Sequence, residues 1–323
     1  MCTSARPAAV PVSFELFPPR DDAAALALGR TIDRLAVVGP EFFAVTFGAG
    51  GSIGGRSLTV LRYILGQTQV PAMAHLTCVG SSVAGANALV REFLDAGVTS
   101  FLALRGDAPK TGGTGIGDLG SAAELAQLIL RVQQERQPYG ERPLVPGRPA
   151  TEVIERPRPV RIAVAAYPSG HPRSRSRWQD IDALAAKEAA GATMALTQVL
   201  FEPDDYLEYC ARARDAGVSI PIVPGIMPAD SPARLARIAE LSDQTPPPAL
   251  AAALASAENR AAAREIGIEH VVQLATTILA AGAPGLHLYS FNRHDSVLPI
   301  IDRLIGRGAL APSPTRTITE ASA

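Results

Sequence analysis

Cysteine is scarce in this chain, with Cys2, Cys78 and Cys210 the only three among 323 residues. An odd, widely spaced set argues against a disulfide framework and lacks the close pairs of a structural zinc site. The five histidines are also scattered, without an HxH or HxxxH pair, so we expect no metal site. This cysteine usage fits a reducing compartment, and we expect a cytoplasmic protein.

Long hydrophobic runs and excess charge are also missing. No apolar run approaches the ~20 residues of a membrane span, and the first residues lack the apolar core of a signal peptide. Charged residues make up 19% of the chain and the formal net charge is -1. Neither nucleic acid nor a membrane surface is therefore expected as a partner.

Apolar, β-rich runs recur eight times along the chain, at residues 10–17, 42–47, 71–78, 100–105, 161–167, 193–201, 220–224 and 285–291. Amphipathic helical segments alternate with them, at residues 23–37, 83–96, 122–135, 178–190, 203–216, 232–241 and 265–281. Strands alternating with helices imply parallel strands joined by crossovers. Eight such units in a chain of this length predict a (βα)8 TIM barrel. An open doubly wound sheet is the alternative.

The predicted domain is one α/β barrel over residues 10–306, with flexible ends at 1–9 and 307–323. A segment rich in proline, arginine and glycine, 138–159, precedes the fifth run. We interpret it as a solvated insertion, with an oligomer contact as the second possibility. An alanine-rich stretch at 249–263 predicts an extra helix after the seventh unit.

Polar side chains follow most of the predicted strands. Barrel enzymes collect their chemistry at the carboxyl ends of the strands. One such residue would be ordinary, but a whole set indicates a site. Its members are Glu15, Thr46, His75, Arg105, Gly106, Asp107, Tyr167, His171, Gln198, Asn292 and Arg293.

Glu15 is the most informative of these residues, because it stands between Phe14 and Phe17 and just before two prolines. Burying a charge costs several kcal/mol unless it is compensated, and apolar surroundings favour the protonated form of a carboxyl. Glu15 is therefore a candidate general acid. A structural carboxylate bound to backbone N–H groups is the alternative.

The other members also have ordinary structural explanations. A lone histidine such as His75 is most often a satisfied core residue, and Thr46 could cap its loop. Gln198 needs polar partners inside an apolar strand, so a ligand contact and a structural hydrogen bond are both open. The alternatives are a local ion pair for Arg105 with Asp107, packing for Tyr167 with His171, and a surface cation for Arg293.

Two glycine-rich segments resemble nucleotide-binding loops. Residues 115–120 match GxGxxG but follow no strand, which favours a flexible loop over a dinucleotide fingerprint. Residues 48–52 do follow a strand, so their N–H groups could approach a ligand, but they lack a P-loop lysine. No GxSxG elbow is present, although a serine triad stays open.

Taken in order, the motifs resemble the methylenetetrahydrofolate reductase family. They are SFELFPP at 13–19, VTFGA at 45–49, HLTC at 75–78, LRGD at 104–107, AAYP at 165–168, HP at 171–172, TQ at 197–198, PGIMP at 224–228 and LYSFNR at 288–293. Each motif alone is weak, whereas the ordered set is specific. The resemblance covers about residues 12–304 and is to bacterial-type members with the catalytic domain only.

This resemblance implies a (βα)8 barrel that binds FAD non-covalently and takes NADH or NADPH as co-substrate. It further implies ping-pong hydride transfer through FAD that reduces 5,10-methylenetetrahydrofolate to 5-methyltetrahydrofolate, in a homo-oligomer. Two alternatives stay open: the same chemistry run as methyltetrahydrofolate oxidation, and a barrel that binds flavin or folate without catalysis.

The resemblance also assigns residue roles. It implies Glu15 as general acid, with Asp107 and Gln198 as further catalytic residues. Cofactor contacts are implied for Thr46, Phe47, Ala49, His75, Arg105, Gly106, Asp107, Tyr167, His171, Asp180 and Lys187. Substrate contacts are implied for Asp107, Gln198 and Arg293. The sequence departs from the family pattern at Ser169 and Gly170, where a glutamate is usual, and at Ala183 and Ala186, where polar cofactor contacts are frequent.

Overall fold

The computed structural model describes residues 10–47, 54–79, 82–106, 117–136 and 159–312. The predicted flexible start at 1–9 lies outside these residues. So do residues 138–158 of the predicted insertion and residues 313–323 at the end of the chain. Just beyond the predicted boundary at 306, Leu310 is buried against the core.

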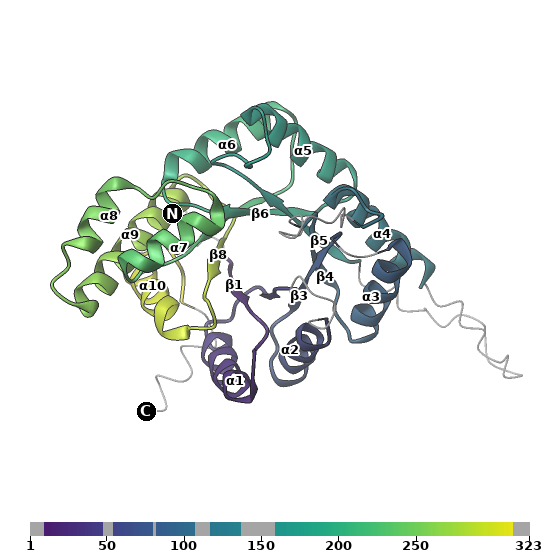
Figure 1. Ribbon diagram of the computed structural model, residues 1–323, viewed down its shortest axis with the longest axis horizontal. Helices are drawn as coiled ribbons and strands as arrows, with labels where there is room; N and C mark the ends of the chain where they lie inside the picture. Colours follow the sequence, from purple (N-terminus) through teal and green to yellow (C-terminus); the bar gives the residue numbers. More distant parts are fainter. Residues whose placement is uncertain (1–9, 48–53, 80–81, 107–116, 137–158, 313–323) are drawn as a thin grey trace, which may run out of the picture.

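Eight parallel strands form a closed barrel in chain order (Figure 1). They are β1 (Val12–Leu16), β2 (Phe43–Val45), β3 (Ala72–Thr77), β4 (Ser100–Leu104), β5 (Arg161–Ala166), β6 (Met194–Val199), β7 (Ile222–Ile226) and β8 (Leu286–Tyr289). β1 pairs with β8 as well as with β2, which closes the sheet and leaves it without an edge. The predicted (βα)8 barrel is confirmed, and the open sheet is excluded.

Helices surround the barrel on its outside (Figure 1). Those in the described residues are α1 (Asp22–Ala36), α2 (Gly54–Gln67), α3 (Val83–Asp95), α4 (Ala122–Glu135), α5 (Arg177–Ala189), α6 (Pro203–Asp215), α7 (Pro232–Ser242), α8 (Pro248–Ala255), α9 (Arg260–Ala280) and α10 (His294–Gly306). None of them is long and apolar enough to cross a membrane.

The extra helix predicted at 249–263 is shorter in the structure, because residues 260–263 begin α9, the helix predicted at 265–281. α8 ends at Ala255, and Asn259 begins α9 by accepting a hydrogen bond from the N–H of Ala262. An asparagine at this position satisfies an N–H that has no partner inside the helix, so it starts a new helix rather than continuing the old one.

Serine side chains fix the entry of the chain into several helices after the strands. Each accepts a hydrogen bond from the backbone N–H three residues ahead, the usual N-cap geometry. The caps precede α3, α4, α5 and α7, and the residues are Ser82, Ser121, Ser176 and Ser231. They anchor the loops at the carboxyl end of the barrel, where the site lies.

Successive residues of the strands face opposite sides of the sheet. Phe43 packs outward in the large cluster shared with the helices, whereas its neighbours Phe42 and Ala44 pack inside the barrel with Met73 and Met194. Because side chains repeat every two residues along a strand, positions two further along point into the barrel again, closer to its carboxyl end. The apolar interior therefore leads directly into a polar layer.

Candidate active site

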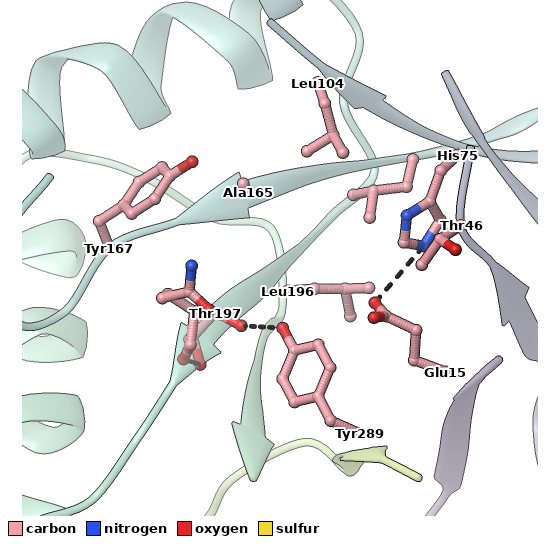
Figure 2. Close-up of a pocket in the computed structure, with 11 residues that line it drawn as sticks. Glu15, Thr46, His75, Leu104, Ala165, Tyr167, Leu196, Thr197 and Tyr289 are labelled. Atoms are coloured by element: carbon pink, nitrogen blue, oxygen red, sulfur yellow. Dashed lines mark hydrogen bonds and ion pairs between the residues drawn. The ribbon is translucent and has the colours of Figure 1, made fainter. Parts of the chain in front are cut away.

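That polar layer surrounds a cavity of about 260 Å³ at the carboxyl end of the barrel (Figure 2). Its walls come from β1, β3, β4, β5, β6 and β8 and from residues that directly follow β2 and β5. The lining residues are Glu15, Thr46, His75, Leu102, Leu104, Ala165, Tyr167, Leu196, Thr197, Gln198 and Tyr289. Five residues predicted from five separate strand ends thus meet in one cavity.

One side of the cavity carries an acidic group beside two imidazoles, which we call the acid wall: Glu15 and His75, which line the cavity, and the buried His287, which does not. Oε2 of Glu15 lies 3.7 Å from Nε2 of His75 and 3.9 Å from Nε2 of His287. All three residues are buried, and Nδ1 of His287 is hydrogen bonded to Oγ of Ser13 at 2.8 Å. The carboxylate is thus held among groups that can exchange a proton with it.

The imidazoles of the acid wall are not ordinary satisfied core histidines. Neither Nε2 has a hydrogen-bond partner among the described residues, although both atoms are buried. Burial lowers the pKa of His75 to about 4, against the opposing effect of Glu15, so this imidazole is neutral at pH 7. A buried polar atom without a partner costs stability, which favours a role toward a ligand.

Gln198 reaches the cavity through an irregularity in the sheet. The register between β6 and β7 shifts between Leu196 and Val199, as in a bulge, which re-aims side chains. Oε1 of Gln198 accepts a hydrogen bond from the N–H of Val199 at 2.9 Å. The amide oxygen is therefore satisfied locally, which leaves its NH2 group as the part available to a ligand.

Gly225 on β7 makes this irregularity possible. A Cβ atom there would lie 2.5 Å from the carbonyl oxygen of Thr197 and 2.7 Å from Cε2 of Tyr289. The N–H of Gly225 donates to Oγ1 of Thr197, and the hydroxyl of Tyr289 donates to the Thr197 carbonyl, both at 2.8 Å. Only glycine allows the three residues to approach so closely.

The opposite side of the site is basic, and we call Arg105, His171 and Lys187 the cationic rim. Nζ of Lys187 donates to the carbonyl oxygen of Ala165 at 2.8 Å and lies 5.8 Å from the ring centre of Tyr167. The ring of His171 meets that of Tyr167 edge to face at 4.6 Å. The predicted contacts Tyr167, His171 and Lys187 therefore lie together.

Burial tunes the charges of the rim. It lowers the pKa of Lys187 to about 8, and nearby Arg105 lowers it further while Asp180 opposes the shift. Burial and Arg105 also lower the pKa of His171. At pH 7 the rim holds two cations, and Asp180 is the carboxylate beside them.

Asp180 organises the loop that leads into the rim. Its carboxylate accepts hydrogen bonds from the N–H of His171 at 3.2 Å and from the Ser174 hydroxyl at 2.5 Å. This loop lines a second cavity of about 320 Å³ that includes Ser169 and Gly170, the positions that depart from the family pattern. Lys187 and Arg105 both act on the charge of His171, which lines this second cavity, and such cations suit an anionic group such as a diphosphate.

The remaining predicted residues have other positions. Phe47 packs against the core, and Gly106 has φ +81 with no room for a Cβ beside Val79. Arg293 is absent from the cavity lining and binds Asp230 and Asp295, each at 3.0 Å. Ala49 and Asp107 lie outside the described residues. Within the described ranges no group of three acidic, histidine or cysteine side chains could hold a metal ion.

Tyr289, which lines the cavity, and His287 of the acid wall were not predicted from the sequence. Both lie on β8, which pairs with β1 so that Tyr289 is opposite Glu15 and His287 is opposite Ser13. The signal that could have found them is barrel closure, because it makes the eighth strand a neighbour of the first.

The methylenetetrahydrofolate reductase family profile matches residues 3–305 of this chain. The chain belongs to this family. The 5,10-methylenetetrahydrofolate reductase of Salmonella typhimurium is 29% identical over 283 residues, which cover 87% of this chain and 86% of that protein. Methylenetetrahydrofolate reductase (NADH) 1 of Zea mays is 30% identical over 302 residues, which cover 90% of this chain but 48% of the plant protein.

Among solved structures, a similar one is an uncharacterized protein from Clostridium thermocellum, described as binding two copies of 5-methyl-5,6,7,8-tetrahydrofolic acid. Its TM-score is 0.61 with 12% sequence identity, and the alignment covers 91% of this chain and 95% of that one. At this identity the likeness supports the barrel fold alone.

Proposed function

We propose that this family member is an FAD-dependent reductase that converts 5,10-methylenetetrahydrofolate to 5-methyltetrahydrofolate with NADH or NADPH. The observation that carries the proposal is the acid wall, in which a buried carboxyl at the cavity lies within 4 Å of two imidazole nitrogens that have no hydrogen-bond partner among the described residues. The names of the bacterial and plant relatives support the substrate, and that of the plant relative supports a pyridine nucleotide.

In this proposal Glu15 is the general acid. Opening the five-membered ring of the substrate requires a proton on a ring nitrogen, and the C–N bond then breaks to leave an iminium carbon. A carboxyl that is 8% exposed delivers that proton without competition from bulk water. A flavin held at the site and reduced by NADH or NADPH would supply the hydride that converts the iminium to the methyl group.

Gln198 and the resemblance-based Asp107 complete the substrate contacts in this proposal. With its oxygen held by Val199, the amide of Gln198 presents N–H donors to the cavity. Such donors match the ring nitrogen and carbonyl acceptors of a pterin. The role of Asp107 remains a prediction from the family motif.

The cationic rim is the part of the site that fits the diphosphate of FAD. Arg105 and Lys187 would neutralise its charge, while Thr46, Tyr167, His171 and Asp180 would position the rest of the cofactor. A buried carboxyl beside two imidazole nitrogens that lack a hydrogen-bond partner among the described residues favours catalysis over passive binding, because these groups are able to transfer a proton. A cytoplasmic homo-oligomer remains the prediction, and light scattering measures the assembly.

Glu15→Gln tests the proposal by separating two half-reactions. The variant should keep its reduction of bound flavin by NADH, but its oxidation by methylenetetrahydrofolate should slow about 10²–10⁴-fold, the usual effect of losing a general acid. Anaerobic stopped-flow absorbance measures both steps. Glu41→Gln, which changes a partly exposed carboxylate paired with Arg161, is the matched control and should leave both rates unchanged. Full folate turnover by Glu15→Gln would refute the assignment.

A further inference from the structure

A glutamine outside the cavity lining connects two loops of the site. Gln244 lies two residues beyond the end of α7, and its Nε2 donates a hydrogen bond to the carbonyl oxygen of Val199 at 2.7 Å. Its Oε1 accepts one from the hydroxyl of Ser169 at 3.3 Å. Val199 ends β6 and Ser169 lies in the loop after β5, so one amide joins the carboxyl ends of two neighbouring strands.

The end of α7 fixes the backbone of this glutamine. Asp243 has φ 51, in the left-handed region, and the N–H of Gln244 donates to the carbonyl oxygen of Ala239 at 2.9 Å. This pairing across six residues is typical of a Schellman helix end, which turns the chain in a defined way. Three prolines follow at 246–248 and restrict the backbone further. The position from which the side chain reaches the two loops is therefore set by the fold.

The hydrogen bond to Val199 supports the segment that aims Gln198. Val199 is buried at the end of β6, where a carbonyl oxygen without a partner would be costly. Gln244 supplies that partner, while the N–H of Val199 donates to Oε1 of Gln198 at 2.9 Å. The register between β6 and β7 shifts in this same segment. Gln244 therefore anchors the short irregular stretch that directs the NH2 group of Gln198 to the cavity.

The hydrogen bond to Ser169 supports residues 167–171, which we call the cofactor loop because Tyr167 and His171 begin and end it. The Ser169 hydroxyl lies 2.9 Å from Oδ2 of Asp205 in α6 and 3.3 Å from Oε1 of Gln244, so its one proton faces two acceptors. The loop is thus attached to α6 and to the end of α7 through a single side chain.

This connection depends on the residue types at both of its ends. Position 169 is one where the sequence departs from the family pattern, in which a glutamate is usual. A carboxylate there would face the carboxylate of Asp205 and the amide oxygen of Gln244, and none of these three groups has a proton to donate. Rotating the amide would only move the conflict, because its oxygen would then face the Val199 carbonyl. The Ser169 hydroxyl supplies the donor that both acceptors need.

We propose that Gln244 is a positioning residue that holds the substrate amide of Gln198 and the cofactor loop in one fixed arrangement. It acts through Val199 on one side and through Ser169 on the other. This inference rests on the proposed function, because Gln198 and the cofactor loop are the parts assigned there to the folate and to FAD. Loss of the Gln244 amide therefore affects both ligands, whereas loss of the Ser169 hydroxyl affects the cofactor alone.

The test compares Gln244→Met, which keeps the length of the side chain and removes both hydrogen bonds, with Ser169→Ala, which removes the loop side only. In Gln244→Met the KM for 5,10-methylenetetrahydrofolate should rise about 10-fold and the Kd for FAD about threefold, within the range of roughly 2–10-fold for a neutral hydrogen bond. Ser169→Ala should raise the Kd for FAD at least as much and leave the folate KM unchanged. Anaerobic steady-state kinetics and isothermal titration calorimetry measure the two constants.

Gln273→Met is the matched control, because it makes the same change at an exposed position of α9. It should leave both constants at their wild-type values, and thermal melting checks that every variant is folded.

A double-mutant cycle separates positioning from a general loss of stability. If Gln244 acts through Gln198, Gln244→Met should raise the folate KM no further in a Gln198→Ala protein, whereas a loosened fold would raise it by the same factor in both backgrounds. Equal factors, an unchanged KM in Gln244→Met, or an unchanged Kd for FAD in both single variants would overturn the positioning role alone. No turnover of methylenetetrahydrofolate by the wild type would overturn the proposed function and this role with it.

Discussion

The acid wall and the cationic rim stand on opposite sides of one barrel mouth and differ in how their polar groups are satisfied. In the acid wall, Glu15 and two histidines are buried and two imidazole nitrogens have no partner among the described residues. In the rim, Lys187 is hydrogen bonded to a backbone carbonyl and His171 is packed against a ring. One side buries a carboxyl between two histidines, and the other holds a partly buried lysine on a backbone carbonyl.

The same physical cause has opposite results on the two sides. Burial lowers the pKa of His75 to about 4 and that of Lys187 to about 8. At pH 7 the histidine is therefore neutral and the lysine still carries its charge. Desolvation thus keeps His75 of the acid wall neutral and leaves Lys187 of the rim charged. One barrel can in this way separate proton chemistry from anion binding.

The largest expected effect on stability comes from Gly225, which allows the irregularity at Gln198 and packs against Tyr289, the register partner of Glu15. Gly225→Ala places a Cβ against the Thr197 carbonyl and the Tyr289 ring, so the free energy of unfolding should fall by ~3 kcal/mol, the upper end for overpacking. Urea denaturation measures the change. Gly66→Ala is the control, because Gly66 in α2 has no atom within 4 Å of an added Cβ, and it should stabilise by about 0.5–1 kcal/mol. Equal stability of the two variants would contradict the close approach.

His75→Leu tests whether the histidine of the acid wall is buried in its neutral form. Since the folded pKa of about 4 lies below the ordinary 6.5, the unfolded chain binds the proton first as the pH falls. The contribution of His75 to the free energy of unfolding is therefore fully present above pH 6.5. It falls by roughly 3 kcal/mol in total between pH 6.5 and 4. Unfolding free energies measured across that range should therefore fall less steeply in His75→Leu. An unchanged slope would show that His75 is not buried in its neutral form.

Lys187→Met should have a smaller effect, confined to the rim. Loss of one charged hydrogen bond should weaken FAD binding about 10-fold, with NADH reduction of the bound flavin retained. In the wild type, FAD affinity should also decline as the pH rises through about 8, because Lys187 loses its charge there.

The control for this variant is Lys187→Arg, whose charge persists over the whole range and which should remove the decline. Isothermal titration calorimetry from pH 6.5 to 9.5 measures all three proteins. A decline that persists in Lys187→Arg would assign it to another group.

The strand pattern of the sequence predicted most of the barrel, because each strand is a short apolar run ended by a polar residue. Two helices were not among the predicted segments, α2 and α10. α2 begins with two glycines and α10 contains Pro299, and both features weaken a helical pattern unless tertiary packing supports it. The seventh strand lies at Ile222–Ile226 rather than 220–224, since its prolines obscured the run.

Some residues of the site could likewise be predicted from the sequence, and others could not. Residues at strand ends, such as Glu15 and Gln198, could be found because the barrel places every strand end at one face. Tyr289 could not, since its place in the site depends on barrel closure. Sequence position indicates Arg293 as a substrate contact; in the structure it pairs with Asp230 and Asp295, and the contact stays a prediction.

The most direct test of the whole account is one anaerobic cycle of the wild-type protein loaded with FAD. NADH should bleach the flavin absorbance, and 5,10-methylenetetrahydrofolate should then restore it with formation of one equivalent of 5-methyltetrahydrofolate. Protein that takes up no FAD, or reduced flavin that methylenetetrahydrofolate does not reoxidise, would contradict the account.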